Sequence, residues 1–237
     1  MTERFDALLQ VQEHDTTIDQ LRHRRATLPE REVLARADAS LRELERRTAP
    51  IRAAHADLAA TQAALEQQID AARTRRAELE RKMFAGGIPA RDLQAMDEEV
   101  RHLAARVAEL EDREIEVMEA LEPLDAELAA AEAERASLEH QAAIARDAIA
   151  AAAAVIDQQI ADEREQRAAA ASEVDAALLE RYERLREKLG GTGAARLVGN
   201  SCGGCHLVLP AMELERIRQA PPDAVVTCEQ CGRILVR

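Results

Sequence analysis

A long, regular stripe of apolar residues constrains this chain more than any other feature of its sequence. From Leu34 to Met83, stripe residues recur at alternating spacings of three and four for seven heptads. An α-helix places residues with this spacing on one face, and a sustained repeat predicts a coiled coil. We therefore expect a helix from about Glu30 to Phe84, bent locally at Pro50. The stripe consists of Leu34, Ala37, Leu41, Leu44, Thr48, Ile51, His55, Leu58, Gln62, Leu65, Ile69, Ala72, Arg76, Leu79 and Met83.

The composition also favours long helices over a compact globular core. Among 237 residues there are no Trp, one Tyr and two Phe, whereas 32% of the residues are charged. A globular core of this size would bury far more aromatic area, and abundant Ala, Glu, Arg and Leu with helical periodicity is typical of coiled coils. The net charge of −13 argues against a chain that binds polyanions over its whole length.

A turn signal at residues 85–90 separates this stripe from a second one. Gly86 and Gly87 permit positive φ, and Pro89 prevents the preceding helix from continuing. A helix as long as either stripe is not stable in water without a partner. We therefore expect the two helices to fold back on each other as an antiparallel hairpin.

The second stripe runs from Leu93 to Ile156 and then shifts, which we interpret as a stutter within one helix that reaches Leu189. A shorter helix is expected over residues 3–28, broken at Pro29 and covering about residues 147–172 of the long helix. The glycine-rich segment 190–193 should end the long helix.

All four cysteines lie near the end of the chain, in two CxxC pairs separated by residues 206–227. Two such pairs can bring four thiolates to the corners of one tetrahedron, which is the geometry of a structural zinc ion. A shell closed by four thiolates leaves no position for water or substrate, so the metal would be structural. The predicted ligands of this one Zn²⁺ are Cys202, Cys205, Cys228 and Cys231.

Other readings of the cysteines are open. Two disulfides or free thiols would need no metal, but the N-terminus has no signal-peptide character, and we expect a reducing cytoplasmic location. A redox CxxC lacks the βαβ context that this motif needs. Iron also fits a four-thiolate site, although zinc is the better default.

These observations predict a mainly α protein with a long antiparallel coiled-coil hairpin and a small C-terminal four-cysteine zinc ribbon. We expect the hairpin over residues 1–189, with its turn at 85–90 and a break near 29, then a hinge at 190–195 and the ribbon at 196–237. The longest apolar run, Ala148 to Ile156, is far shorter than the ~20 residues that span a membrane, so membrane insertion is not expected. The sequence leaves the oligomeric state open.

Two blocks of sequence resemble a known family. The first is Met83-Phe84-Ala85-Gly86 followed by residues 89–100, PARDLQAMDEEV. The second is Cys202-Gly203-Gly204-Cys205-His206, closed by residues 226–235, VTCEQCGRIL. Together they resemble the bacterial C4-type zinc-ribbon family with an N-terminal coiled-coil hairpin, some of whose members act as adaptors in flagellar and type III secretion systems.

The resemblance implies a protein that is not an enzyme and contacts protein partners through its coil. At the hairpin tip, the candidate partner-binding residues are Phe84, Ile88 and Arg91. Relatives often have Tyr and Ser where this chain has Phe84 and Ala85, so a hydrogen-bonding role of that pair need not transfer. Alternatively, the apolar tip residues close the hairpin core as its last heptad.

RNA binding by the ribbon has been proposed in this family, and nucleic-acid binding (RNA or DNA) is the alternative function. The residues that could reach phosphates are Arg216, Arg218, Arg233 and Arg237. The acidic chain and the scarcity of aromatic stacking residues argue against this alternative. Catalysis is also not expected, because the sequence has no phosphate-binding glycine loop, nucleophile elbow or open metal site.

Overall fold

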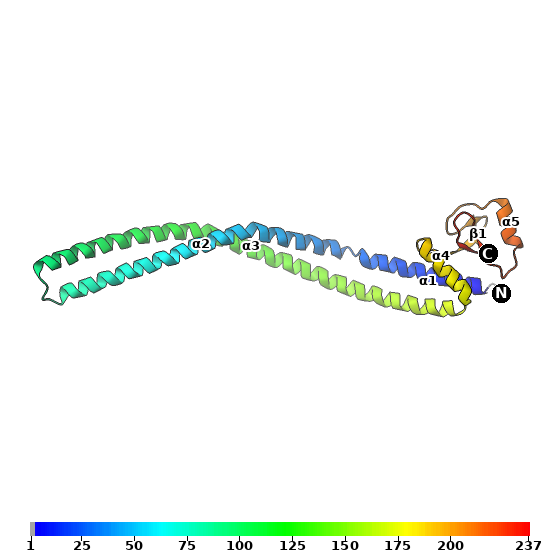
Figure 1. Cartoon of the computed structure of the whole chain (residues 1–237), viewed down its shortest axis with the longest axis horizontal. Coiled ribbons are helices and arrows are strands. Elements are labelled where there is room, and N and C mark those ends of the chain that lie inside the picture. The colour runs from blue at the N-terminus through cyan, green and yellow to red at the C-terminus, as the bar shows by residue number, and fades with distance from the viewer. Residues whose placement is uncertain (1–2) are drawn as a thin grey trace. The chain divides into compact units, whose positions relative to one another are not determined.

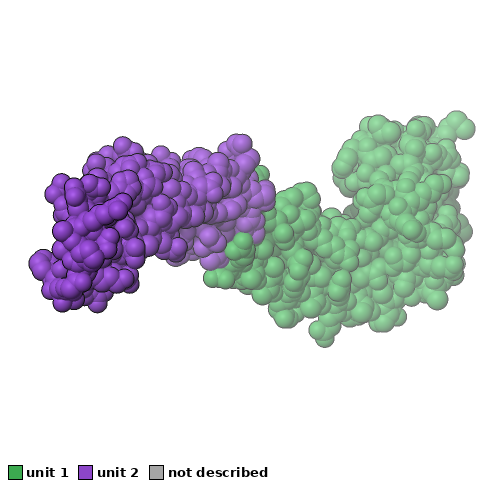
Figure 2. All heavy atoms as spheres, turned by 60° about the vertical axis from the view of Figure 1, so that its left-hand side comes forward, with its two compact units in different colours: residues 1–32, 145–237 green, residues 33–144 purple. Residues whose placement is uncertain are grey.

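The computed structural model describes residues 3–237, which form two compact units (Figure 2). One unit comprises residues 33–144, and the other combines residues 3–32 with 145–237. The helices are α1 (Glu3–Ala26), α2 (Glu30–Phe84), α3 (Ala90–Ser172), α4 (Ala176–Lys188) and α5 (Ala211–Gln219). The strands are β1 (Ala194–Val198), β2 (Ser201–Cys202), β3 (Val226–Thr227) and β4 (Ile234–Val236). None of the helices found in residues 3–237 has the length and apolar character needed to cross a membrane.

The unit of residues 33–144 is the predicted antiparallel hairpin of α2 and α3 (Figure 1). Leu65 and Ile69 of α2 pack with Val107 and Leu110 of α3 in its buried core. Ion pairs between the helices flank this seam, among them the one between Arg75 and Glu99, whose Nε and Oε1 lie 3.3 Å apart. Pro50 lies inside α2, which continues on both sides of it.

The continuous helix to Leu189 predicted from the stripe is wrong, because α3 ends at Ser172 and α4 begins at Ala176. Asp175 caps the new helix: its backbone is extended, and its carboxylate accepts a hydrogen bond of 2.9 Å from the N–H of Leu178. An N-cap of this kind satisfies a backbone donor that the first turn leaves free. Val174 and Leu178 keep an apolar spacing across the break, so the periodicity did not reveal it.

In the other unit, a four-stranded sheet of order β2-β1-β4-β3 separates two buried clusters. Strands β1 and β4 pair in parallel, and the outer pairs are antiparallel. Successive strand residues face opposite sides of a sheet. Accordingly, Ile234 and Val236 join a cluster with Leu8 and Val11 of α1, whereas Leu235 joins a cluster with the cysteines.

Buried charges join α1 to α3 and α4. Asp15, only 4% exposed, accepts hydrogen bonds from Arg167 Nε at 2.8 Å and from the hydroxyl of Tyr182 at 2.8 Å. Burial and the Asp15 carboxylate raise the pKa of Tyr182. Ile18 of α1 and Leu28, which follows the helix, pack with Ile156 and Ile160 of α3. These two residues of α3 lie within the range 147–172 that α1 was predicted to cover.

Gln12 of α1 binds the glycine-rich segment after α4. Its Oε1 accepts hydrogen bonds from the N–H groups of Gly193 at 2.7 Å and Ala194 at 3.3 Å, and its Nε2 donates to the carbonyl of Gly191 at 3.0 Å. A Cβ on Gly193 would lie 2.7 Å from the carbonyl oxygen of Tyr182, so only glycine fits there. The predicted domain boundaries at residues 190 and 196 stay a prediction, but this segment has defined contacts with α1.

We expect Gln12→Ala to destabilise the unit that contains α1 by about 2–3 kcal/mol, because it leaves buried backbone donors without acceptors. Urea unfolding, followed by hydrogen exchange of the Gly193 and Ala194 amides, measures the effect. Gln158→Ala, at an exposed position of α3, is the matched control and should leave the transition unchanged. Equal stability of both variants would show that Gln12 does not hold this segment.

Candidate metal centre

The fold gathers all four predicted thiols. Cys202 ends β2, and Cys205 follows it in a tight turn; Cys228 follows β3, and Cys231 lies in the turn before β4. The four Sγ atoms all lie within 4.8 Å of one another. The distance is 3.9 Å between Cys202 and Cys231 and 4.0 Å between Cys205 and Cys228.

These distances fit a tetrahedral zinc ion. Zn–S bonds of about 2.3 Å place the sulfur atoms of a tetrahedron ~3.8 Å apart. Cys202 and Cys228 are fully buried, whereas Cys205 and Cys231 are half-buried, so the cluster lies at the edge of the core beneath Leu235. Soft thiolates in this arrangement select zinc or iron over hard cations.

The first knuckle, residues 202–206, is held by backbone hydrogen bonds. The N–H of Gly203 donates to the carbonyl of Arg196 at 2.9 Å, and the N–H of Gly204 points at the sulfur of Cys202 at 3.4 Å. The N–H of His206 donates to the carbonyl of Cys202 at 2.8 Å, and His206 adopts φ of 60°. A Cβ on Gly203 would lie 2.7 Å from the carbonyl oxygen of Arg196, so close approach explains this glycine.

The second knuckle, residues 228–232, repeats this pattern. The N–H of Gly232 donates to the carbonyl of Cys228 at 2.8 Å, and Gly232 adopts φ of 76°. Burial raises the pKa of Cys228, and the backbone N–H groups of Cys231 and Gln230 partly oppose this by favouring its thiolate. Hydrogen bonds of this kind orient a thiolate and stabilise its charge.

The thiols of Cys202, Cys228 and Cys231 do not ionise alike. Burial raises the pKa of Cys202 and raises that of Cys228 to about 12. Burial acts in the same direction on Cys231, but the N–H and the guanidinium of Arg233 oppose it and bring its pKa down to about 7. A bound cation would favour all four thiolates.

Sequence reasoning missed Glu213. This residue of α5 is only 4% exposed, and its Oε1 accepts a hydrogen bond of 2.9 Å from the N–H of Glu229, inside the second knuckle. An acidic residue in the first turn of a helix suggests an interaction with the helix dipole. The sequence did not reveal that the side chain turns inward.

The four arginines predicted to reach phosphates have partners within the chain. Arg216 pairs with Glu229 at 2.6 Å, and Arg218 is 3.5 Å from the side-chain oxygen of Asn200. Arg233 donates to the carbonyls of Thr192 and Leu189. Arg237 donates to the carbonyls of Ile217, Ala220 and Pro221, at and just after the end of α5.

At the hairpin tip, Phe84 is 91% exposed, Ile88 is half-buried and Arg91 is exposed. Gly86 and Gly87 have φ of 79° and 83°, as the turn signal predicts. The tip thus presents one aromatic ring to solvent from a turn whose backbone favours glycine.

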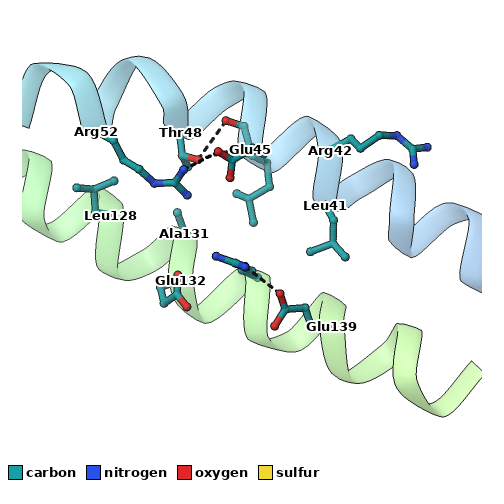
Figure 3. Close-up of a pocket in the computed structure, with 11 residues that line it drawn as sticks. Leu41, Arg42, Glu45, Thr48, Arg52, Leu128, Ala131, Glu132 and Glu139 are labelled. Carbon is teal, nitrogen blue, oxygen red and sulfur yellow. Dashed lines mark hydrogen bonds and ion pairs between the residues drawn. The ribbon is translucent and has the colours of Figure 1, made fainter.

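The hairpin of residues 33–144 also has a hollow of about 410 Å³ between α2 and α3 (Figure 3). Its apolar lining includes Leu41, Leu128 and the small Ala131. The ion pairs Glu45–Arg52 and Arg135–Glu139 each run along one helix, and Arg42 points away from the hollow. Charges of the two helices also act on one another, Glu45 on Arg135 and Glu132 on Arg52, so the arginines and glutamates of the lining balance.

The chain matches two family models. The model described as CT398-like coiled coil hairpin domain matches residues 11–190, and the C4-type zinc ribbon domain matches residues 201–235. Two uncharacterised proteins of Mycobacterium tuberculosis, Rv2229c of strain H37Rv and MT2288 of strain CDC 1551, are 34% identical over 231 residues. These matches cover 98% of this chain and 94% of the relatives.

Solved structures show the same fold. A Mycobacterium smegmatis protein has a TM-score of 0.85 at 32% identity, over 100% of this chain and 99% of its own. CT398 of Chlamydia trachomatis has a TM-score of 0.66 at 20% identity, over 97% and 95% of the two chains. The ribbon match and the clustered thiols together define a site for one structural zinc ion. The chain belongs to the CT398-like coiled-coil hairpin family and carries a C4-type zinc ribbon.

Proposed function

We propose that this protein is a non-catalytic adaptor that engages partner proteins through its coiled-coil hairpin and its zinc ribbon. The observation that carries the proposal is the exposed ring of Phe84, which is 91% accessible in a chain with only two phenylalanines. Exposed aromatic side chains are enriched at protein interfaces, where they become the main contributors to affinity.

The surroundings of Phe84 support a partner with an acidic surface. Residues 81–91 contain Arg81, Lys82 and Arg91 and no acidic residue, although the chain as a whole has a net charge of −13. Before the tip, arginines of α2 pair with carboxylates, as Arg76 does with Glu80 at 3.4 Å. Within residues 3–237 the three tip cations have no carboxylate partner; Arg81 only donates to the carbonyl of Ala77. Complementary charge would steer an acidic partner to the tip.

The ribbon offers a second contact surface. Val198 and Val208 are 62% and 70% exposed. Both pair with Ser201 across neighbouring strands, so their side chains project from the same face of the sheet. We assign these two exposed valines to the contact surface of the ribbon.

The zinc ion keeps this surface folded in the proposed function. We assign Cys202, Cys205, Cys228 and Cys231 as its ligands, which close the coordination shell and leave no position for a substrate. The proposal places the protein in the cytoplasm, where thiolate ligands stay reduced.

Nucleic-acid binding by the ribbon is the less supported alternative. A phosphate would have to displace Glu229 from Arg216 and backbone carbonyls from Arg233 and Arg237. Phosphate contacts supply most of the affinity for nucleic acid, and these guanidinium groups already have partners.

We expect Phe84→Ala to abolish capture of partner proteins from a lysate of the native host without changing the helicity of the bait. The ring is exposed, so its removal should change the free energy of unfolding by less than about 0.5 kcal/mol. Immobilised protein, mass spectrometry of the captured proteins and circular dichroism of each variant measure both effects.

The matched control is Ile115→Ala, which removes an apolar side chain that is 54% exposed on α3 in the same unit. It should capture the same proteins as the unmodified chain. If Phe84→Ala also captures them to the same extent, the tip does not contact the partner.

A further inference from the structure

The two zinc knuckles share two backbone hydrogen bonds and differ at the donor that follows the first cysteine. In both, the residue after the second cysteine has positive φ and donates its N–H to the carbonyl of the first cysteine at 2.8 Å. In both, the N–H of the first cysteine donates to the carbonyl five residues further on, which is that of Leu207 at 3.1 Å and that of Arg233 at 2.9 Å. The backbone of one knuckle therefore predicts the contacts of the other.

The exception is the N–H of the residue directly after the first cysteine. In the first knuckle this donor belongs to Gly203, and its acceptor is the backbone carbonyl of Arg196 on β1, at 2.9 Å. In the second knuckle the donor belongs to Glu229, and its acceptor is the side chain of Glu213, at 2.9 Å. A carboxylate from α5 thus replaces a strand carbonyl.

Helix α5 holds this carboxylate in place. Leu214 and Ile217 are buried on the same helix, and Glu213 itself is 4% exposed. Arg216, one turn further, pairs with the side chain of Glu229 at 2.6 Å. The same helix therefore contacts both the backbone and the side chain of one knuckle residue.

A buried carboxylate is costly unless its interactions offset the loss of hydration. The second oxygen of Glu213, Oε2, is buried and has no hydrogen-bond partner among residues 3–237. The hydrogen bond to Glu229 is thus its single polar contact in the described structure. If Glu213 served only the dipole of α5, its side chain would gain more by remaining in solvent.

We propose that Glu213 is a positioning residue that fixes the second zinc knuckle through the N–H of Glu229. Hydrogen-bonding partners of metal ligands typically contribute 10- to 100-fold in metal affinity. Glu213 bonds to the residue after the ligand Cys228 rather than to the ligand itself, so we expect an effect near the lower end of this range. Because the first knuckle is held by a backbone carbonyl, the second is the one that a single side-chain substitution can loosen.

Two substitutions distinguish the effect of the hydrogen bond on zinc affinity from the effect of the negative charge. Glu213→Gln removes the charge and keeps an oxygen in place of Oε1, so zinc affinity should stay within a few-fold of the original. Glu213→Asp keeps the charge but shortens the side chain by one methylene, so the carboxylate no longer reaches the N–H. Its zinc affinity should fall about 10-fold. Glu215→Ala, at an exposed position of α5, is the control and should bind zinc as the unmodified chain does.

Competition with a chromophoric chelator measures zinc affinity in the full-length protein. Amide resonances of the zinc-loaded variants give the second readout: in Glu213→Asp the Glu229 amide should move upfield while the Gly203 amide stays in place. Unchanged zinc affinity in Glu213→Asp would overturn the proposal. Equal losses in both variants, or equal shifts of both amides, would also overturn it, because they would indicate an effect of charge or of overall stability.

Discussion

Strand β4 is the constraint on which the rest of the metal-binding unit depends. Its alternating side chains belong to two cores at once, because Ile234 and Val236 pack on α1 and α4 while Leu235 packs beside the cysteines. A strand of three residues has too few side chains to form either core by itself. The ribbon sheet is therefore the layer between the zinc site and the helices, and the position of each depends on the other.

Because the ribbon sheet packs on α1, this helix does more than cover α3. Its apolar residues Leu8 and Val11 face the sheet, Gln12 binds the glycine-rich segment, and Asp15 pairs with Arg167. Polar residues at seam positions weaken an isolated coiled coil, but here they have partners supplied by α3 and α4. These residues of α1 connect α3 to the ribbon. The stability of α1 therefore depends on that of the metal-binding unit. In the hairpin of residues 33–144, by contrast, a regular apolar seam packs without any contribution from the metal.

Much of this could be predicted from the sequence, because repeated spacings have simple geometric consequences. The stripe from Leu34 to Met83 and the two CxxC pairs predicted the hairpin and the four-thiol cluster. The break before Ala176 was not predicted, since the apolar spacing continues through Val174 and Leu178, which pack in one core with residues of α1. Glu213 was equally hidden, because its partner lies 16 residues away along the chain. Both depend on tertiary packing, which a local pattern does not encode.

Hydrogen exchange before and after zinc removal tests most directly whether α1 and the ribbon share one folding unit. Local stability differs between parts of a protein, and exchange of backbone amides resolves it. If β4 joins the two cores, chelation of zinc should raise exchange in residues 5–12 of α1 together with the ribbon, while residues around Leu65 and Leu110 keep their protection. Loss of protection confined to residues 196–237, with α1 unchanged, would contradict this account.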